Sequence, residues 1–275
     1  MPIVFAAVAP HGTMVLEDNA GPAARTRAAL EELGRRFDAA RPEVTVVLTP
    51  HGVHVHDAFA VVVAGALSGT LADPPAELNC PVAREPAAAL LEALRADGVP
   101  AVGVSFGGND PDEAEMPMDW GTMVPLWFMG GRTEPQVPAV VVSPARERPL
   151  EEHVRAGAAI ARAAGGRIAV VASADHGHAH DAEGPYGLDP AAAEYDRRLL
   201  ALLESNRLDG VAELSALAEP AKADSLWQLV MLHGALGDRF EGEVLAYEVP
   251  TYFGMLCAVY EPKGSAVTRD ARLQP

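Results

Sequence analysis

Short apolar runs alternate with longer amphipathic segments along most of the chain. The runs cover residues 3–9, 44–50, 59–65, 99–106, 137–143 and 167–173, with a later pair at 243–249 and 255–261. Apolar runs of four to eight residues are typical of strands that are buried on both faces of a sheet. The pattern predicts an α/β fold with a central, mostly parallel or mixed sheet.

Helical segments are expected between these runs. They cover residues 21–40, 86–97, 150–166, 189–206 and 224–237. The second begins with Pro86 and stops before Gly98, the usual placement of proline at a helix start and glycine after its end. We expect helices on both faces of the sheet and a single catalytic domain over residues 1–275. Residues 107–121, which are rich in Gly, Pro and Asp, are expected to form an irregular loop.

Charge and cysteine content exclude several classes of protein. Acidic residues outnumber basic ones 38 to 21 and the net charge is -17, which disfavours nucleic acid and anionic membrane surfaces as partners. The two cysteines, Cys80 and Cys257, lie far apart in the sequence and show no metal-type spacing. The first residues lack the basic and long apolar segments of a signal sequence. We therefore expect a soluble cytoplasmic protein.

Histidines gather after three of the predicted strands. His11 follows the first strand in APHG, His51 follows the second in TPHG, and SADHGHAH (173–180) places three more after the sixth. Ligands of open α/β sheets bind at the carboxyl ends of strands, where neighbouring loops meet. One histidine after a strand is ordinarily a loop residue, but the two Pro-His-Gly turns together favour a shared metal site.

The remaining histidines are given other roles. His54 is a candidate substrate contact, whereas His56 is assigned to a solvated loop. His153 lies in a charged helical turn and is expected at the surface, and His233 is expected to pack near a helix end. Imidazole pairs bind zinc, copper, nickel or iron, so the third ligand decides the metal. A carboxylate would complete the two-His, one-carboxylate set of non-haem Fe(II) oxygenases.

Several motifs of the chain are similar to those of the class III extradiol ring-cleavage dioxygenases, the superfamily of the protocatechuate 4,5-dioxygenase catalytic subunit. The likeness is spread over APHG (9–12), VVLTPHGVHVHDAFAVV (46–62), DWGTMVPL (119–126), VVASADHGH (170–178), YGLDPAAAEYDRRLL (186–200) and DSLWQLVMLHGAL (224–236). Each motif is weak alone, and their order and spacing together carry the resemblance.

The resemblance implies a function and a set of site residues. His11 and His51 correspond to the iron-binding histidines, and His178 to the catalytic histidine. Asp224 takes the place of a glutamate ligand, with Glu248 as its rival and helix capping as its structural alternative. The implied reaction is Fe(II)-dependent cleavage of a catechol-type or aminophenol-type ring by O2, with His178 moving protons.

Other expectations concern the substrate and partners. Trp120 stands where related enzymes commonly have histidine, and Trp120 and Tyr186 are candidate walls of the substrate pocket or ordinary loop residues. The small aromatic diol and O2 are the expected ligands. Relatives of this superfamily mostly self-associate and some need a small partner subunit, so we expect a homo-oligomer, with or without such a subunit.

Two alternatives remain open from the sequence. A zinc-dependent hydrolase would use the same two-His, one-carboxylate set with an open position. A non-catalytic ligand-binding protein could keep the same fold. A dinucleotide enzyme is disfavoured because no G-x-G-x-x-G motif follows a predicted strand.

Overall fold

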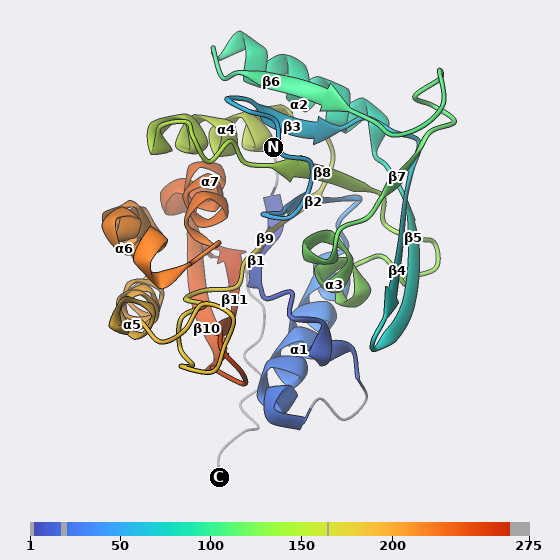
Figure 1. Ribbon diagram of the computed structural model, residues 1–275. Helices are drawn as coiled ribbons and strands as arrows, with labels where there is room; N and C mark the ends of the chain where they lie inside the picture. Colours follow the sequence, from blue (N-terminus) through green and yellow to red (C-terminus); the bar gives the residue numbers. More distant parts are fainter. Residues whose placement is uncertain (1–2, 18–20, 164, 265–275) are drawn as a thin grey trace.

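The main sheet of the protein has eight strands. The computed structural model describes residues 3–17, 21–163 and 165–264 (Figure 1). The strand order is β10-β11-β1-β9-β2-β8-β3-β6. The bounds are β1 Ile3–Ala9, β2 Val44–Leu48, β3 Phe59–Val62, β6 Ala101–Val104, β8 Ala139–Ser143, β9 Ile168–Ser173, β10 Phe240–Glu248 and β11 Met255–Pro262.

The four central strands, β1, β9, β2 and β8, run parallel to one another. Antiparallel pairs lie on either side, where β1 meets β11 and where β8 meets β3. The predicted mostly parallel or mixed sheet is therefore confirmed. Parallel neighbours bring the carboxyl ends of β1, β9 and β2 to one edge of the sheet, next to one another.

Apolar residues on alternate faces hold the sheet between two cores. All five residues of β2 are buried. Val46 and Leu48 pack into the core on one face, and Val47 packs into a core on the other. Because successive side chains of a strand point to opposite faces, a continuous apolar run is what a strand covered on both sides requires.

Seven α-helices lie in the described part of the chain, and they cover both faces of the sheet (Figure 1). One face packs against α2 (Arg84–Ala96), α4 (Leu150–Ala163), α5 (Pro190–Glu204), α6 (Ser215–Ala221) and α7 (Leu226–Leu236). The other packs against α1 (Ala24–Ala40), α3 (Trp120–Phe128) and a small sheet of order β5-β4-β7. The expectation of helices on both faces is confirmed.

The small sheet was not expected, and the predicted loop at 107–121 is partly wrong. Its strands are β4 (Ala66–Ala72), β5 (Pro75–Pro81) and β7 (Glu115–Pro117). β5 has a proline at each end and β4 contains Ser and Gly, so neither reads as a strand by propensity. The three residues of β7 pair with β4, and α3 begins at Trp120 because the Asp119 carboxylate accepts a hydrogen bond from the Thr122 amide at 3.0 Å.

The expectation that His153 lies at the surface was wrong, because the residue is buried. Its ring centroid lies 4.8 Å from that of Phe59 in the sheet. His153, Ala156 and Ile160 share the inner face of α4, and the charged neighbours in the sequence concealed this spacing. The predicted helix 150–166 ends at Ala163, and residue 164 lies outside the described residues.

A single domain over residues 1–275 stays a prediction. Residues 1–2 and 265–275, at the two ends of that range, lie outside the described residues. Across the three described ranges, none of the helices has the length and apolar character that a membrane span requires.

Candidate metal centre

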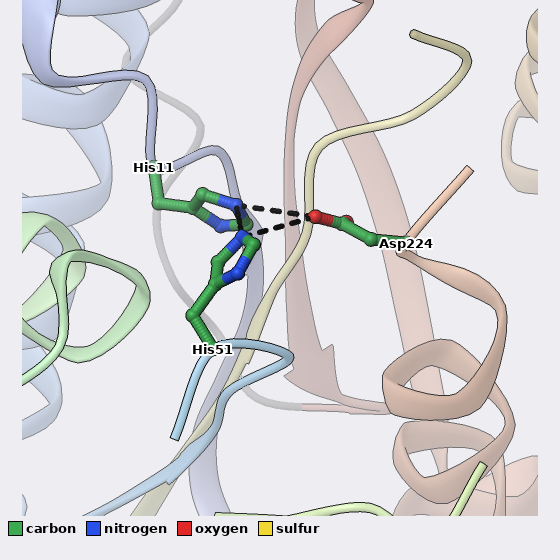
Figure 2. Close-up of side chains that lie close together, drawn as sticks. All are labelled: His11, His51 and Asp224. Atoms are coloured by element: carbon green, nitrogen blue, oxygen red, sulfur yellow. Dashed lines mark hydrogen bonds and ion pairs between the residues drawn. The ribbon is translucent and has the colours of Figure 1, made fainter. Parts of the chain in front are cut away.

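His11 and His51 approach each other from neighbouring strand ends. His11 follows β1 by two residues and is buried, and its Nδ1 lies 2.9 Å from the hydroxyl oxygen of Ser173, the last residue of β9. This contact turns Nε2 of His11 away from the sheet, toward His51. The two Nε2 atoms are 3.0 Å apart, and the rings are nearly perpendicular at 88° (Figure 2).

Asp224 joins the two imidazoles from the other side. Its Oδ2 lies 3.4 Å from Nε2 of His11 and 3.2 Å from Nε2 of His51 (Figure 2). The N-cap of α7 is Ser225, and the other carboxylate oxygen of Asp224 accepts a hydrogen bond from the Asp175 amide at 3.2 Å. Asp224 therefore does not cap the helix, and its side chain points at the histidines.

The three ligand atoms have the spacing of one coordination sphere. Metal–ligand bonds of about 2.0–2.2 Å at angles near 90–110° hold neighbouring ligand atoms about 3.0–3.5 Å apart. The observed separations are 3.0, 3.2 and 3.4 Å. Oδ2 of Asp224 is buried without a hydrogen-bond partner, an expensive state unless a cation satisfies it. His11, His51 and Asp224 thus fit a divalent metal.

A second buried carboxylate, Asp175, adds negative charge to the centre. Its Oδ1 accepts a hydrogen bond from the His11 amide at 3.1 Å, and its Oδ2 lies 3.3 Å from Nε2 of His11. Burial lowers the pKa of His11, but the charges of Asp175 and Asp224 outweigh it and raise this pKa to about 9. Burial raises the pKa of the Asp175 carboxyl above its usual range, and the Asp224 charge adds to that shift. A bound divalent cation would balance the negative charge of the two carboxylates.

Glu248, the alternative candidate for the carboxylate ligand, makes its contacts with α1 instead. Its Oε1 accepts hydrogen bonds from the amide and the hydroxyl of Thr26 in α1, at 2.8 and 2.6 Å. Two groups of described side chains have metal-ligand spacing. One is the largely buried set of His11, His51 and Asp224, and the other is an exposed set of His54, His56 and Glu147. Asp224 is therefore the carboxylate that the fold brings to the two histidines.

His178 lies beside the centre and is half-buried. Its ring stacks on Phe253, with centroids 5.2 Å apart and planes 18° from parallel. A Cβ atom at Gly12 would lie 2.9 Å from the same Phe253 ring. One aromatic ring therefore separates His178 from the turn that carries His11, and glycine at position 12 allows that ring to approach.

The two histidines that flank His178 are structural. Nδ1 of His176 lies 3.0 Å from the hydroxyl of Ser225, which also lies 3.0 Å from the hydroxyl of Tyr195. Burial lowers the pKa of His176 to about 4, so its ring is neutral. His180 contacts the buried Asp196 carboxylate at 2.9 Å. Together they fix the backbone on both sides of His178.

The candidate substrate residues contact different parts of the site. The ring of Trp120 lies 4.3 Å from that of His51, at 31°, and the residue is 46% exposed. Tyr186 meets His178 edge-on with centroids 6.0 Å apart and is 55% exposed. His54 is also exposed, and its Nε2 pairs with Glu147 at 3.2 Å. Trp120 and Tyr186 lie against site histidines, whereas His54 has a separate partner, and the substrate roles of all three stay predictions.

Sequence reasoning missed several supporting residues. Ser173 and Asp175 orient His11, and Asp119 accepts a hydrogen bond from the Thr49 hydroxyl at 2.6 Å, which ties the end of β2 to α3. Asp119 directly precedes the apolar segment 120–128, and an aspartate in that place is a helix-start signal that could have located it. Phe253 carries no such signal, because only the three-dimensional fold brings it to His178.

Comparison with known proteins agrees with this architecture. Protein CA_C1420 of Clostridium acetobutylicum is 24% identical over 231 residues, which cover 81% of this chain and 49% of that protein. The chain thus spans about half the length of this curated relative. The crystal structure of uncharacterized protein JW3007 from Escherichia coli K12 shares the fold, with a TM-score of 0.61 at 19% identity over 93% of this chain and 99% of that chain.

The family comparison covers nearly the whole chain. The family described as the catalytic LigB subunit of aromatic ring-opening dioxygenase matches residues 5–257. That range contains all three residues of the candidate metal centre and His178. It confirms the resemblance that the motifs suggested, and the chain belongs to the LigB family of aromatic ring-opening dioxygenase catalytic subunits.

Proposed function

We propose that this protein is an Fe(II)-dependent extradiol dioxygenase that opens the ring of a catechol-type or aminophenol-type substrate with O2. The observation that carries the proposal is the convergence of Nε2 of His11, Nε2 of His51 and Oδ2 of Asp224 within 3.0–3.4 Å of one another. A two-His, one-carboxylate set with open positions is typical of non-haem Fe(II) oxygenases. Membership of the LigB family supports the same chemistry.

When bound, Fe(II) would be held by His11, His51 and Asp224 and would supply the redox chemistry between the substrate and O2. The protein's part is to hold the ligands in one geometry. Ser173 and Asp175 orient His11, and the Asp175 amide holds Asp224. Such supporting contacts fix the direction and basicity of metal ligands.

His178 is the residue that we assign to proton transfer. Its Nδ1 lies 2.7 Å from the carbonyl oxygen of His176. A carbonyl oxygen can only accept, so Nδ1 carries the hydrogen and Nε2 of the neutral ring has a free lone pair. Nε2 can therefore take a proton from a substrate hydroxyl and return it later in the reaction.

The surroundings favour a substrate without a carboxylate. Asp175 and Asp224 already place two carboxylates in the centre, and the charge of Asp119 reaches His11. The groups that flank the ligands and His178 are aromatic: Trp120 on His51, and Tyr186 and Phe253 on His178. An uncharged catechol or aminophenol suits such walls better than an anion would. Self-association and a small partner subunit stay predictions.

The test is anaerobic reconstitution of the full chain with Fe(II), followed by oxygen uptake and absorbance on catechol, protocatechuate and 2-aminophenol. The His178→Ala variant is run in parallel, with His233→Ala in the last turn of α7 as the matched control. Stoichiometric oxygen uptake with a coloured ring-opened product, lost in His178→Ala and kept in the control, is expected. Tight zinc binding with no oxygen uptake on any of the three compounds would overturn the proposal in favour of a zinc hydrolase or a binding protein.

A further inference from the structure

The loop between β2 and β3 carries a second group of metal-binding side chains outside the centre. His54 and His56 are separated by one residue, in a segment closed by an antiparallel bridge between Val55 and Ala58. Asp57 makes the turn with a φ of 59°. His56 and Asp57 are the two turn residues that this bridge encloses. The turn brings the two imidazoles together, because one ring nitrogen of His54 lies within 4.8 Å of one ring nitrogen of His56.

Glu147 faces this pair from a different part of the chain, the segment between β8 and α4. Its Oε1 lies 3.2 Å from Nε2 of His54. One ligand atom from each of His54, His56 and Glu147 lies within 4.8 Å of the other two. A metal bound at about 2.1 Å holds its ligand atoms no more than roughly 4.2 Å apart. Small rotations of these exposed side chains would therefore complete the set.

Neighbouring charges leave the carboxylate of Glu147 available to a cation. Arg148 hydrogen-bonds both carboxylate oxygens of Glu152, at 2.8 and 2.7 Å. Arg146 lies over the ring of Trp227 at 4.8 Å. Both arginines that flank Glu147 in the sequence are therefore engaged elsewhere. On the other side, Asp57 lies 3.2 Å from Nε2 of His56 and adds negative charge.

The donor set selects the kind of cation. Two imidazoles and one carboxylate suit zinc, copper(II) or nickel, whereas calcium and magnesium prefer oxygen ligands. The side chains of His54 and His56 are 60% and 79% exposed, so a bound ion would keep water at its remaining positions and exchange freely with solvent. This differs from the buried His11–His51–Asp224 centre.

We propose that His54, His56 and Glu147 form a second, solvent-exposed site for a borderline divalent cation such as Zn²⁺. A bound ion would join the loop after β2 to the segment after β8. These two segments already meet beside His51, because the Arg146 guanidinium donates to the carbonyl oxygen of Pro50 at 3.4 Å. The ion would thus hold the loop that begins with a ligand of the first centre. This site does not depend on the proposed dioxygenase activity.

The experiment is an equilibrium Zn²⁺ titration of the metal-free full chain, with bound zinc counted after dialysis. The variants are the His54→Ala/His56→Ala double substitution and Glu147→Gln, with Glu151→Gln as the matched control on the exposed start of α4. We expect two zinc ions per wild-type chain and one per double variant. Glu147→Gln should weaken the second site by at least about tenfold, and Glu151→Gln should bind as wild type does.

A Cu²⁺ titration followed by electron paramagnetic resonance separates the two centres. In an Asp224→Asn variant, which weakens the buried centre, the remaining copper signal should show imidazole nitrogen coupling that the added His54→Ala/His56→Ala substitutions abolish. Equal zinc counts and affinities in wild type and the double variant would overturn the proposal. So would a wild-type chain that binds a single zinc ion which the double variant keeps, and neither result would argue against the buried centre.

Discussion

Nδ1 of His178 lies 2.7 Å from the carbonyl oxygen of His176. This short contact joins a candidate catalytic ring to the backbone two residues before it and fixes which ring nitrogen carries the hydrogen. The same peptide segment is held by His176 on Ser225 and by His180 on Asp196. His178 is therefore a half-buried side chain on a segment that is anchored on both sides.

Replacing His178 should separate metal binding from turnover. His178→Ala and His178→Gln should bind Fe(II) as tightly as wild type, because His178 lies outside the ligand set, but lose about 10²- to 10⁴-fold in turnover with the loss of the proton-transfer group. Metal content and the rate of oxygen uptake measure the two effects. Unchanged turnover in both variants would remove His178 from the mechanism.

Asp196 should act on turnover through the segment that carries His178. Its carboxylate accepts hydrogen bonds from the Gly177 amide at 2.8 Å and from the Tyr247 hydroxyl at 2.8 Å, and contacts His180 at 2.9 Å. Asp196→Asn cannot accept all three, so His178 should shift and kcat should fall about tenfold or more, with KM and metal content nearly unchanged.

Tyr247→Phe is the matched variant for this test. It removes one of the three donors and keeps the carboxylate, so a smaller fall in kcat is expected than for Asp196→Asn. The pH profile of kcat should move in Asp196→Asn, since the geometry of the proton-transfer group changes. If both variants lose the same folding stability and kcat does not change, Asp196 has only a structural role.

The choice between Asp224 and Glu248 can be tested by metal affinity. Asp224→Asn keeps the shape of the side chain but removes its charge, so Fe(II) affinity should fall by about 100-fold or more. Glu248→Gln, which removes a charge of the same sign at a carboxylate bound to Thr26, should leave the affinity unchanged. Loss of metal in Glu248→Gln alone would contradict the assignment.

Trp120 is expected to affect the aromatic substrate rather than the metal. Trp120→Ala removes the ring that lies 4.3 Å from His51. If that ring also contacts the substrate, KM should rise about two- to tenfold, the range expected for one aromatic pair. Trp120→Phe should restore most of this affinity. An unchanged KM in Trp120→Ala would place the substrate elsewhere.

Burial of His153 should make the free energy of unfolding depend on pH in the acid range. Burial lowers its pKa below the usual 6.5, so the folded state binds this proton less readily than the unfolded state. The free energy of unfolding should then be intact above pH 6.5 and should fall as the pH drops from 6.5 to the lowered pKa. Its Nε2 is buried without a hydrogen-bond partner.

His153→Leu should therefore lose less stability than wild type between pH 7 and pH 5. Urea unfolding at a series of pH values measures this difference. The His233→Ala variant serves as the histidine control and should keep the wild-type slope. Parallel curves for wild type and His153→Leu would contradict a buried neutral imidazole.

Much of the main sheet could be predicted from the sequence because its central strands are buried on both faces. The run at 3–9 coincides with β1, and the run at 167–173 differs from β9 by one residue. Continuous burial makes such strands apolar at every position. The β4–β5 hairpin lacks this property, because one side of it faces solvent and prolines end its second strand.

Two of the candidate metal ligands could be placed from the sequence for a related reason. His11 follows the end of β1 by two residues and His51 follows the end of β2 by three, so the position of each buried strand sets the position of its histidine. Asp224 comes from a helix start far along the chain and entered only through the family resemblance. His153 was wrongly predicted at the surface because its sequence neighbours are charged. Its helical spacing with Ala156 and Ile160, which places it on the buried face of α4, was overlooked.

The most direct test of the central claim is mass spectrometry of the product formed by the Fe(II)-loaded protein from an uncharged catechol under ¹⁸O2. A dioxygenase built on His11, His51 and Asp224 predicts a ring-opened product that carries two ¹⁸O atoms, with no such product from Asp224→Asn. A product whose added oxygen comes only from water, or no ring opening by metal-loaded wild-type protein, would contradict it.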